Sequence, residues 1–271
     1  MKILLFSLSA IVLILSFCSC DKLDADKNYL YIPSQITERD SANVASTVNL
    51  GYDSMNRLTE IAETITRDTI TYYVSQTSIS YDDKGNPLQM NKTETVYSPE
   101  NKQNDTFENT YSFSYATDNT VDIIHKRNEE NETISIKLNG DGMIETYSEQ
   151  NSAKNIGFTY TGKNISTKTE NNAVETYTYD DKRGLFRDIN TPQWFIIAFL
   201  DNYDLKISAL FERNVSIQNN PVGIQRKDAE EKTSRNLYEY TYNAFHYPIH
   251  ISEGPKTNPY KTVDIYYTKA K

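Results

Sequence analysis

The chain has 271 residues and carries 28 Lys and Arg against 37 Asp and Glu, a formal net charge of −9 at pH 7. An acidic surface repels phosphate backbones and anionic lipid head groups, which argues against nucleic acid as a partner and against a polybasic membrane contact. The only two cysteines, Cys18 and Cys20, lie near the N-terminus. Disulfides, cysteine nucleophiles and thiolate metal sites are therefore excluded from the rest of the chain.

The first 19 residues have the pattern of a secretory signal peptide. Lys2 supplies a positive charge, and an almost unbroken apolar run covers Ile3–Phe17 before Asp21 begins a charged stretch. About 20 apolar residues are needed to cross a bilayer, so this run is too short for a membrane-spanning helix. The sequence Phe17-Cys18-Ser19-Cys20 resembles the lipobox of bacterial lipoproteins. That resemblance implies cleavage before Cys20, lipidation of its sulfur and anchoring in the outer membrane.

Residues 20–45 are expected to be the lipidated cysteine and a polar tether, because they contain no copy of the repeat described below. The acidic stretch Asp21–Asp26 resembles the surface-export signal of Bacteroidota lipoproteins. It implies that the protein faces the cell exterior, with the periplasmic face of the membrane as the alternative. Residues 46–271 are then a single domain, since a stretch of this length suffices for one sizeable core.

A short phrase recurs along this domain. It consists of a Tyr or Leu that ends a strand, a few polar residues, a Gly or Asn, and an apolar residue that opens the next strand. The Gly or Asn falls where the chain needs a positive φ, which Gly adopts freely and Asn tolerates. We expect that conformation at Asn56, Gly85, Asn119, Gly142 and Asn164, with Gly184 shifted by one position. Each phrase predicts a β-hairpin with a short loop. The copies are Tyr52–Ile61, Tyr81–Met90, Tyr115–Ile123, Leu138–Ile144, Tyr160–Ile165, Tyr179–Phe186 and Tyr242–Ile249.

The strands that lead into these turns alternate aromatic and polar residues, as in Phe113-Ser114-Tyr115 and Phe158-Thr159-Tyr160. A period of two places the aromatic side chains on one face of a sheet. The fold class is therefore all-β, an antiparallel meander of hairpins with one apolar face that must be covered.

One segment departs from the β pattern. Residues 192–200 are apolar on every side, Thr191 is a suitable N-cap and Pro192 a suitable first helical residue. This pattern favours a short buried helix around which the sheet curls. A buried strand is the alternative, because Ile and Phe also favour extended structure.

The phrases resemble the YD repeats of Rhs-type proteins, whose pattern is Tyr-Asp-x-x-Gly-Arg-Leu, and the copies at Tyr52 and Tyr81 match it best. Over roughly residues 46–270 the chain resembles a family of Bacteroidota lipoproteins of unknown function. The resemblance implies an anchored β-hairpin protein and brings no activity with it. The matching features are the phrase Tyr177–Phe186, the apolar segment Trp194–Leu200, the turn Asn219-Asn220-Pro221 and the hairpin Tyr240–Pro248.

Tyrosines are the candidate ligand-binding residues. Tyrosine rings serve a core well, with the hydroxyl reaching a polar partner at its edge. If the rings are instead exposed, they form a flat aromatic strip that can stack on sugar rings. The candidates are Tyr238, Tyr240 and Tyr242 on one face of a predicted strand, with Tyr247, Tyr266 and Tyr267 expected near them.

No catalytic residue, metal site or cofactor is assigned. His246 and His250 would stand about 13 Å apart on a strand, too far for a shared metal ion. The pairs Asp82-Asp83 and Asp180-Asp181 follow a Tyr at turn entrances, where Asp caps its own backbone. Three short motifs resemble the O-glycosylation signal of exported Bacteroidota proteins, and they place the modification on Ser41, Ser54 and Thr69.

These observations predict a lipid-anchored envelope protein that acts as a non-catalytic binding module, with a glycan as the preferred ligand. A carrier for a hydrophobic or lipid ligand is the first alternative, because the concave face of a curled sheet can hold one. A glycan-cleaving enzyme is the second, and it requires two carboxylates that face each other across a cleft. The expected partners are the outer membrane and a glycan or an envelope protein, and not nucleic acid.

Overall fold

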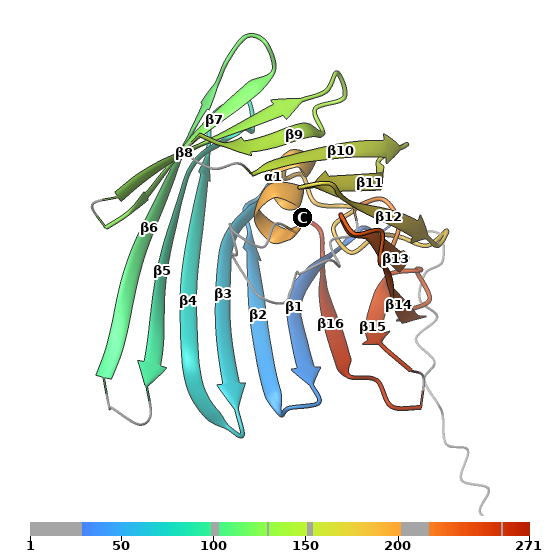
Figure 1. The fold of residues 1–271 in the computed structure, drawn as a ribbon. Helices are drawn as coiled ribbons and strands as arrows, with labels where there is room; N and C mark the ends of the chain where they lie inside the picture. Colours follow the sequence, from blue (N-terminus) through green and yellow to red (C-terminus); the bar gives the residue numbers. More distant parts are fainter. Residues whose placement is uncertain (1–28, 99–102, 129, 151–153, 202–216, 256) are drawn as a thin grey trace, which may run out of the picture.

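The computed structural model describes residues 29–98, 103–128, 130–150, 154–201, 217–255 and 257–271. Within these ranges sixteen antiparallel strands close into a barrel, with a short helix inside the ring of strands (Figure 1). Each strand pairs with its neighbours in the chain, and β1 pairs with β16. The strands are β1 (Tyr31–Asp40), β2 (Val44–Tyr52), β3 (Leu58–Arg67), β4 (Ile70–Tyr81), β5 (Pro87–Ser98), β6 (Gln103–Tyr115), β7 (Thr120–Arg127), β8 (Glu130–Leu138), β9 (Ile144–Glu149), β10 (Asn155–Thr161), β11 (Asn164–Glu170), β12 (Ala173–Tyr179), β13 (Pro221–Lys227), β14 (Thr233–Tyr242), β15 (Pro248–Glu253) and β16 (Lys261–Lys269).

The predicted all-β antiparallel class is confirmed, and the sheet that we expected to curl is closed. Closure depends on β1, whose Ile36 pairs with Val48 of β2 on one side and with Ile265 of β16 on the other. The predicted polar tether over residues 20–45 is therefore wrong from Tyr31 onward. The sequence argument missed β1 because this strand carries no copy of the repeated phrase, although Ile32 and Ile36 are buried in the core.

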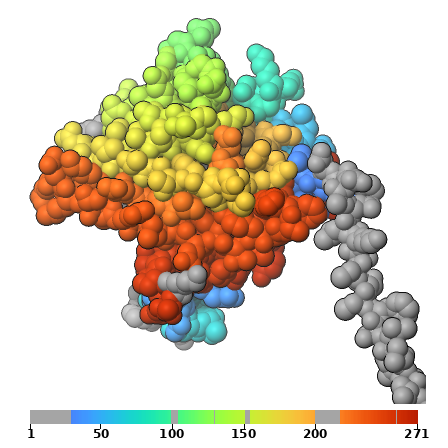
Figure 2. Space-filling view, turned by 90° about the vertical axis from the view of Figure 1, so that its right-hand side faces the viewer, coloured from blue at the N-terminus to red at the C-terminus, as the bar shows by residue number. Residues whose placement is uncertain are grey.

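The two faces of the barrel wall differ in chemistry. The inward-facing Ile, Val, Leu, Phe and Tyr side chains form one connected core. The outward-facing positions are rich in Thr and Ser, as in β4, where Ser78 and Ser80 are exposed and Ile79 between them is buried. This alternation follows from the two-residue period of a strand. Figure 2 shows the wall from the side of the C-terminal strands, which lie next to one another from yellow to red.

All copies of the repeated phrase form connections at the same end of the barrel, which we call the repeat end. Consecutive turns of an antiparallel barrel alternate between its two ends, and one phrase occurs per pair of strands. The Oδ1 atom of Asp53 accepts hydrogen bonds from the backbone N–H groups two and four residues on, Met55 and Arg57. Asp82, Asn139 and Asn243 do the same in their own turns.

The expected positive φ is confirmed in four of these turns, at Asn56 (61°), Gly85 (85°), Asn119 (64°) and Gly142 (73°). The expectation is wrong for Asn164 and Gly184. The turn before β11 is tighter than the others, because Thr161 pairs directly with Asn164, and Gly162 takes the positive φ instead. Gly184 is needed for space, since a Cβ atom there would lie 2.5 Å from the carbonyl oxygen of Ile217.

Tyrosine hydroxyls tie neighbouring strands together at the repeat end. The hydroxyl of Tyr81, at the end of β4, donates to the carbonyl oxygen of Leu58, the first residue of β3, over 2.6 Å. In each of these bonds the acceptor is the first residue of the strand that precedes the tyrosine's own strand. The same bond joins Tyr115 to Pro87, Tyr160 to Ile144, Tyr240 to Pro221 and Tyr267 to Pro248.

The helix inside the barrel is α1 (Gln193–Ile196), continued by the π-helical turn η1 (Ile197–Asp201). We call α1 and η1 together the plug. The predicted helix is confirmed and the strand alternative is wrong. Phe195 and Phe199 are 0% exposed, and their rings lie 5.8 and 5.5 Å from the ring of Phe113. The concave apolar face is thus occupied by the chain itself, which argues against the carrier alternative.

The start of the plug differs from the expectation in one respect. Pro192 is the N-cap and makes no side-chain capping bond, so the predicted capping role of Thr191 is wrong. The hydroxyl oxygen of Thr191 instead accepts a hydrogen bond of 2.7 Å from the backbone N–H of Leu58. Thr191 therefore joins the plug segment to the barrel wall.

Towards the far end of the barrel the inner wall becomes charged. On β3 the buried Ile61 is followed by Glu63, and on β5 Met90 is followed by Lys92. We call the inward-facing charged side chains near this end the inner belt. Glu38 belongs to it, and burial raises the pKa of its carboxyl group to about 7, although the Lys261 ammonium opposes the shift. The belt is held by ion pairs, namely Glu94 with Lys92 (2.8 Å), Glu38 with Lys261 (3.1 Å), Glu175 with Arg226 (3.4 Å) and Glu149 with Lys154 (3.7 Å).

Candidate functional site

The predicted aromatic strip is not exposed. Tyr238 and Tyr247 keep only 4% and 1% of their surface. The hydroxyls of Tyr240 and Tyr267 belong to the inter-strand bonds described above, and the hydroxyl of Tyr242 donates to the carboxylate of Asp180.

The remaining candidate, Tyr266, is 55% exposed and faces outward, because it is next to the inward-facing Tyr267. The prediction of a stacking strip is therefore wrong: the shared face of these tyrosines is the inner face of the barrel. One isolated exposed ring does not make a platform for a sugar chain.

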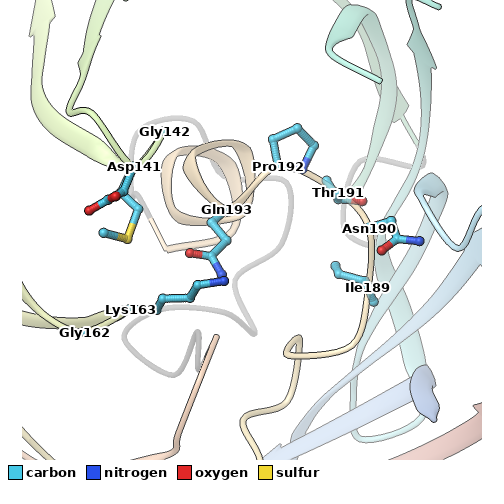
Figure 3. Close-up of a pocket in the computed structure, with 10 residues that line it drawn as sticks. Asp141, Gly142, Gly162, Lys163, Ile189, Asn190, Thr191, Pro192 and Gln193 are labelled. Atoms are coloured by element: carbon cyan, nitrogen blue, oxygen red, sulfur yellow. The ribbon is translucent and has the colours of Figure 1, made fainter. Parts of the chain in front are cut away.

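A pocket at the repeat end is the better candidate site (Figure 3). Its volume is about 680 Å³, within the range of roughly 300–1,000 Å³ that is usual for ligand pockets. Three segments that are far apart in the sequence line it. They are the β8–β9 turn with Asp141–Met143, the β10–β11 turn with Gly162 and Lys163, and the segment Ile189–Gln193 that leads into the plug.

Each lining segment is fixed by hydrogen bonds, either within its own turn or to a neighbouring connection at the repeat end. Asn139 Oδ1 accepts from the backbone N–H groups of Asp141 and Met143, at 2.9 and 3.0 Å. The backbone N–H of Lys163 donates to Gln218 Oε1 over 3.0 Å. On the third side, the backbone N–H of Asn190 donates to the carbonyl oxygen of Asn56, also over 3.0 Å. The walls of the pocket are therefore rigid turns rather than loose loops.

The side chains that line the pocket supply complementary hydrogen-bonding groups. Lys163 and Gln193 point toward one another in the pocket, while Asp141 and Asn190 lie on opposite sides of it (Figure 3). Among the described residues, no hydrogen bond engages the ammonium of Lys163, the amide of Gln193 or the carboxylate of Asp141. An ammonium donates, a carboxylate accepts and an amide does both. The pocket can therefore satisfy a ligand with several hydroxyl groups.

Apolar surface completes the lining. Met143 and Ile189 are 4% and 9% exposed and Pro192 is half-buried, so they form a firm floor rather than mobile surface side chains. A sugar ring has hydroxyls at its edge and C–H groups on its faces, which matches polar side chains around a small apolar floor. Sequence reasoning missed this pocket, because its three segments meet only in the closed barrel.

The acid pairs behave as turn residues. Asp82 Oδ1 accepts from the backbone N–H groups of Lys84 and Asn86, and Asp180 Oδ1 accepts from those of Lys182 and Asn220. The backbone-capping role that we expected for the first residue of each pair is therefore confirmed. In the part of the chain that the structure describes, no group of three or more His, Cys, Asp or Glu side chains is placed to hold a metal ion.

The predicted modification sites lie in exposed turns. Ser41 is in the β1–β2 turn, Thr69 in the β3–β4 turn, and Ser54 in the β2–β3 turn at the repeat end. Their glycosylation stays a prediction. The predicted lipidation site, Cys20, lies outside the described residues. No helix of the described ranges is long and apolar enough to cross a membrane.

No protein-family model matches the chain, and no curated protein matches it. Among solved structures it is similar to a porin-like protein from Bacteroides uniformis, with 16% identity and a TM-score of 0.39 over 88% of this chain and 96% of that one. A porin-like protein from Bacteroides vulgatus gives 12% identity and a TM-score of 0.40, over 88% of this chain and 99% of that one. A likeness this loose carries no information about function.

Proposed function

We propose that this chain is a lipid-anchored envelope protein whose barrel binds a glycan at the repeat end and does not cleave it. The observation that carries the proposal is the pocket lined by Asp141, Lys163 and Gln193. Two hydrogen-bonded turns supply a carboxylate and an ammonium, and the start of α1 supplies an amide. Because a hydroxyl both donates and accepts, such a mixed lining favours a polyhydroxylated ligand over a purely anionic or purely apolar one.

The number and placement of the carboxylates support binding without cleavage. Glycoside cleavage by the usual mechanism needs two carboxyl groups about 5–10 Å apart on either side of the bond. Of the described residues that line the pocket, Asp141 alone carries a carboxylate. The carboxylates of the inner belt, such as Glu94, are engaged by bases and have a structural use. A glycan held in the pocket therefore meets one acid and no partner for it.

The lipobox-like sequence at Cys20 supports an envelope location. The polar outer wall supports a barrel that does not span the membrane. In a membrane-spanning barrel, an apolar band faces the lipid and the interior is polar. Here the buried apolar core faces inward and Thr and Ser predominate outside, as in β6. We therefore propose that the barrel stands beside the membrane and is held there by the lipid on Cys20, with the cell exterior as the side that the acidic stretch Asp21–Asp26 favours.

Affinity electrophoresis tests this function. Residues 21–271 are run through native gels that contain a panel of host and plant polysaccharides. We expect retardation by at least one glycan, and we expect Lys163→Met with Gln193→Leu to abolish it. Lys126→Met, on the outward face of β7, is the matched control and should be retarded like the parent. Equal mobility of parent and double variant across the whole panel would contradict glycan binding in this pocket.

A further inference from the structure

The pocket and the N-terminus of the barrel share one end of the molecule. The carbonyl oxygen of Leu30 accepts a hydrogen bond of 2.9 Å from the N–H of Ala270. The next residue, Lys271, donates from its backbone N–H to Asn56 Oδ1 over 2.8 Å. The carbonyl oxygen of Asn56 in turn accepts from the N–H of Asn190, which lines the pocket. The start of the barrel is thus joined to the pocket wall through three neighbouring contacts.

The chain before the barrel limits how far this end can move from the anchor. Nine residue steps separate Cys20 from Tyr29, and a chain extends by at most about 3.3–3.6 Å per residue, which gives a reach of about 30 Å. The far end of the barrel is one barrel length away from the repeat end, where this tether joins the barrel. Strand β4 has 12 residues, which corresponds to about 40 Å along the strand and to about 30 Å along the axis of a tilted barrel.

We infer that the glycan is presented from the membrane that carries the protein, as the sugar head group of a lipid in the same leaflet. The inference rests on the proposed function and names the source of its ligand. A lipid on Cys20 holds the repeat end, and with it Lys163 and Gln193, within reach of such head groups. The far end, with its turns at Ser41 and Thr69, lies one barrel length from the point where the tether joins the barrel.

This arrangement makes binding effectively intramolecular. Two partners confined to one surface experience a high effective concentration, which can raise apparent affinity by about 10²–10⁴-fold without any new contact. The gain is lost if the geometry keeps the pocket away from the head groups. A test of the inference therefore changes which end of the barrel is anchored to the membrane.

The experiment uses the lipidated full-length protein in vesicles of phosphatidylcholine, whose head group does not react with an amine reagent. The probe is the glycan that retards the protein most in the gel panel, either free or coupled to phosphatidylethanolamine in the same vesicles. An amine-reactive reagent labels lysines, and mass spectrometry reads the protection of Lys163 against that of Lys126. We expect the lipid-coupled glycan to protect Lys163 at a glycan concentration about 10²-fold lower than the free glycan, with Lys126 unchanged.

A reversed anchor is the matched control. In residues 21–271 with Ser41→Cys, which contain no other cysteine, a maleimide lipid is attached at the far end, so the pocket is carried away from the membrane. We expect the advantage of the lipid-coupled glycan to disappear while the free glycan still protects Lys163. Equal protection in both orientations, or failure of the full-length protein to associate with vesicles, would overturn the inference and leave the proposed function standing. Protection by neither form of the glycan would overturn the proposed function itself.

Discussion

The tyrosine bonds at the repeat end can be tested by removing a single hydroxyl. In Tyr240→Phe the ring is kept, and only the hydroxyl that donates to the carbonyl oxygen of Pro221 over 2.8 Å is lost. Tyr240 packs against the core and Pro221 is buried, so water does not easily replace the missing donor. Leaving a buried acceptor unsatisfied costs about 1–3 kcal/mol. We therefore expect the free energy of unfolding to fall by about 1–3 kcal/mol.

Urea unfolding followed by far-ultraviolet circular dichroism measures this change. Tyr266→Phe is the control, because its ring is exposed and a surface change of this kind alters stability by no more than about 0.5 kcal/mol. Both variants should bind glycan like the parent. If Tyr240→Phe kept full stability and lost glycan binding, the structural role of the inward tyrosines would be refuted and the aromatic strip restored as the site.

Three further predictions concern stability. Phe199→Ala removes a fully buried ring that stacks on Phe195 at 4.7 Å, so it should destabilise the barrel by about 3–5 kcal/mol in the same urea assay, and a loss below about 1 kcal/mol would contradict the role of the plug. Gly184→Ala places a Cβ atom 2.5 Å from the Ile217 carbonyl oxygen and should cost about 1–3 kcal/mol, whereas Gly140→Ala, with nothing within 4 Å, should cost much less. Similar losses for the two glycines would show that the close approach at Gly184 is not what matters. Glu38 has its pKa raised from 4.5 to about 7 in the fold, so the unfolded chain loses this proton first and stability falls as the pH rises from about 4.5 to 7. Glu38→Gln should remove that part of the decline, on the order of 3 kcal/mol, from unfolding curves recorded across this pH range, and an unchanged pH profile would contradict the burial of Glu38.

Local chemistry made the turns predictable. Asp53 and Asp82 cap their own turns, and Asn56 and Gly85 supply the positive φ, all within a few residues of each other. The plug could also be predicted, since a segment that is apolar on every side must be buried whatever surrounds it.

What the sequence could not predict depends on contacts between distant residues. Closure requires β1 to pair with β16, and nothing in the sequence of β1 indicates that β16 is its partner. The alternation in β14 shows that Tyr238, Tyr240 and Tyr242 share a face, but not that this face is the inside of a barrel. The pocket is harder to predict from the sequence than the fold, because Asp141, Lys163 and Gln193 come from three segments that meet only after the barrel closes.

Calorimetric titration of the glycan found in the gel panel tests the central claim most directly. The parent, Lys163→Met and the Lys126→Met control are titrated under identical conditions. Loss of a charge-assisted hydrogen bond is worth about 1.5–3 kcal/mol, so Kd for Lys163→Met should rise by about 10–150-fold while Lys126→Met matches the parent. An unchanged Kd for Lys163→Met, with binding intact, would place the glycan elsewhere and contradict the account.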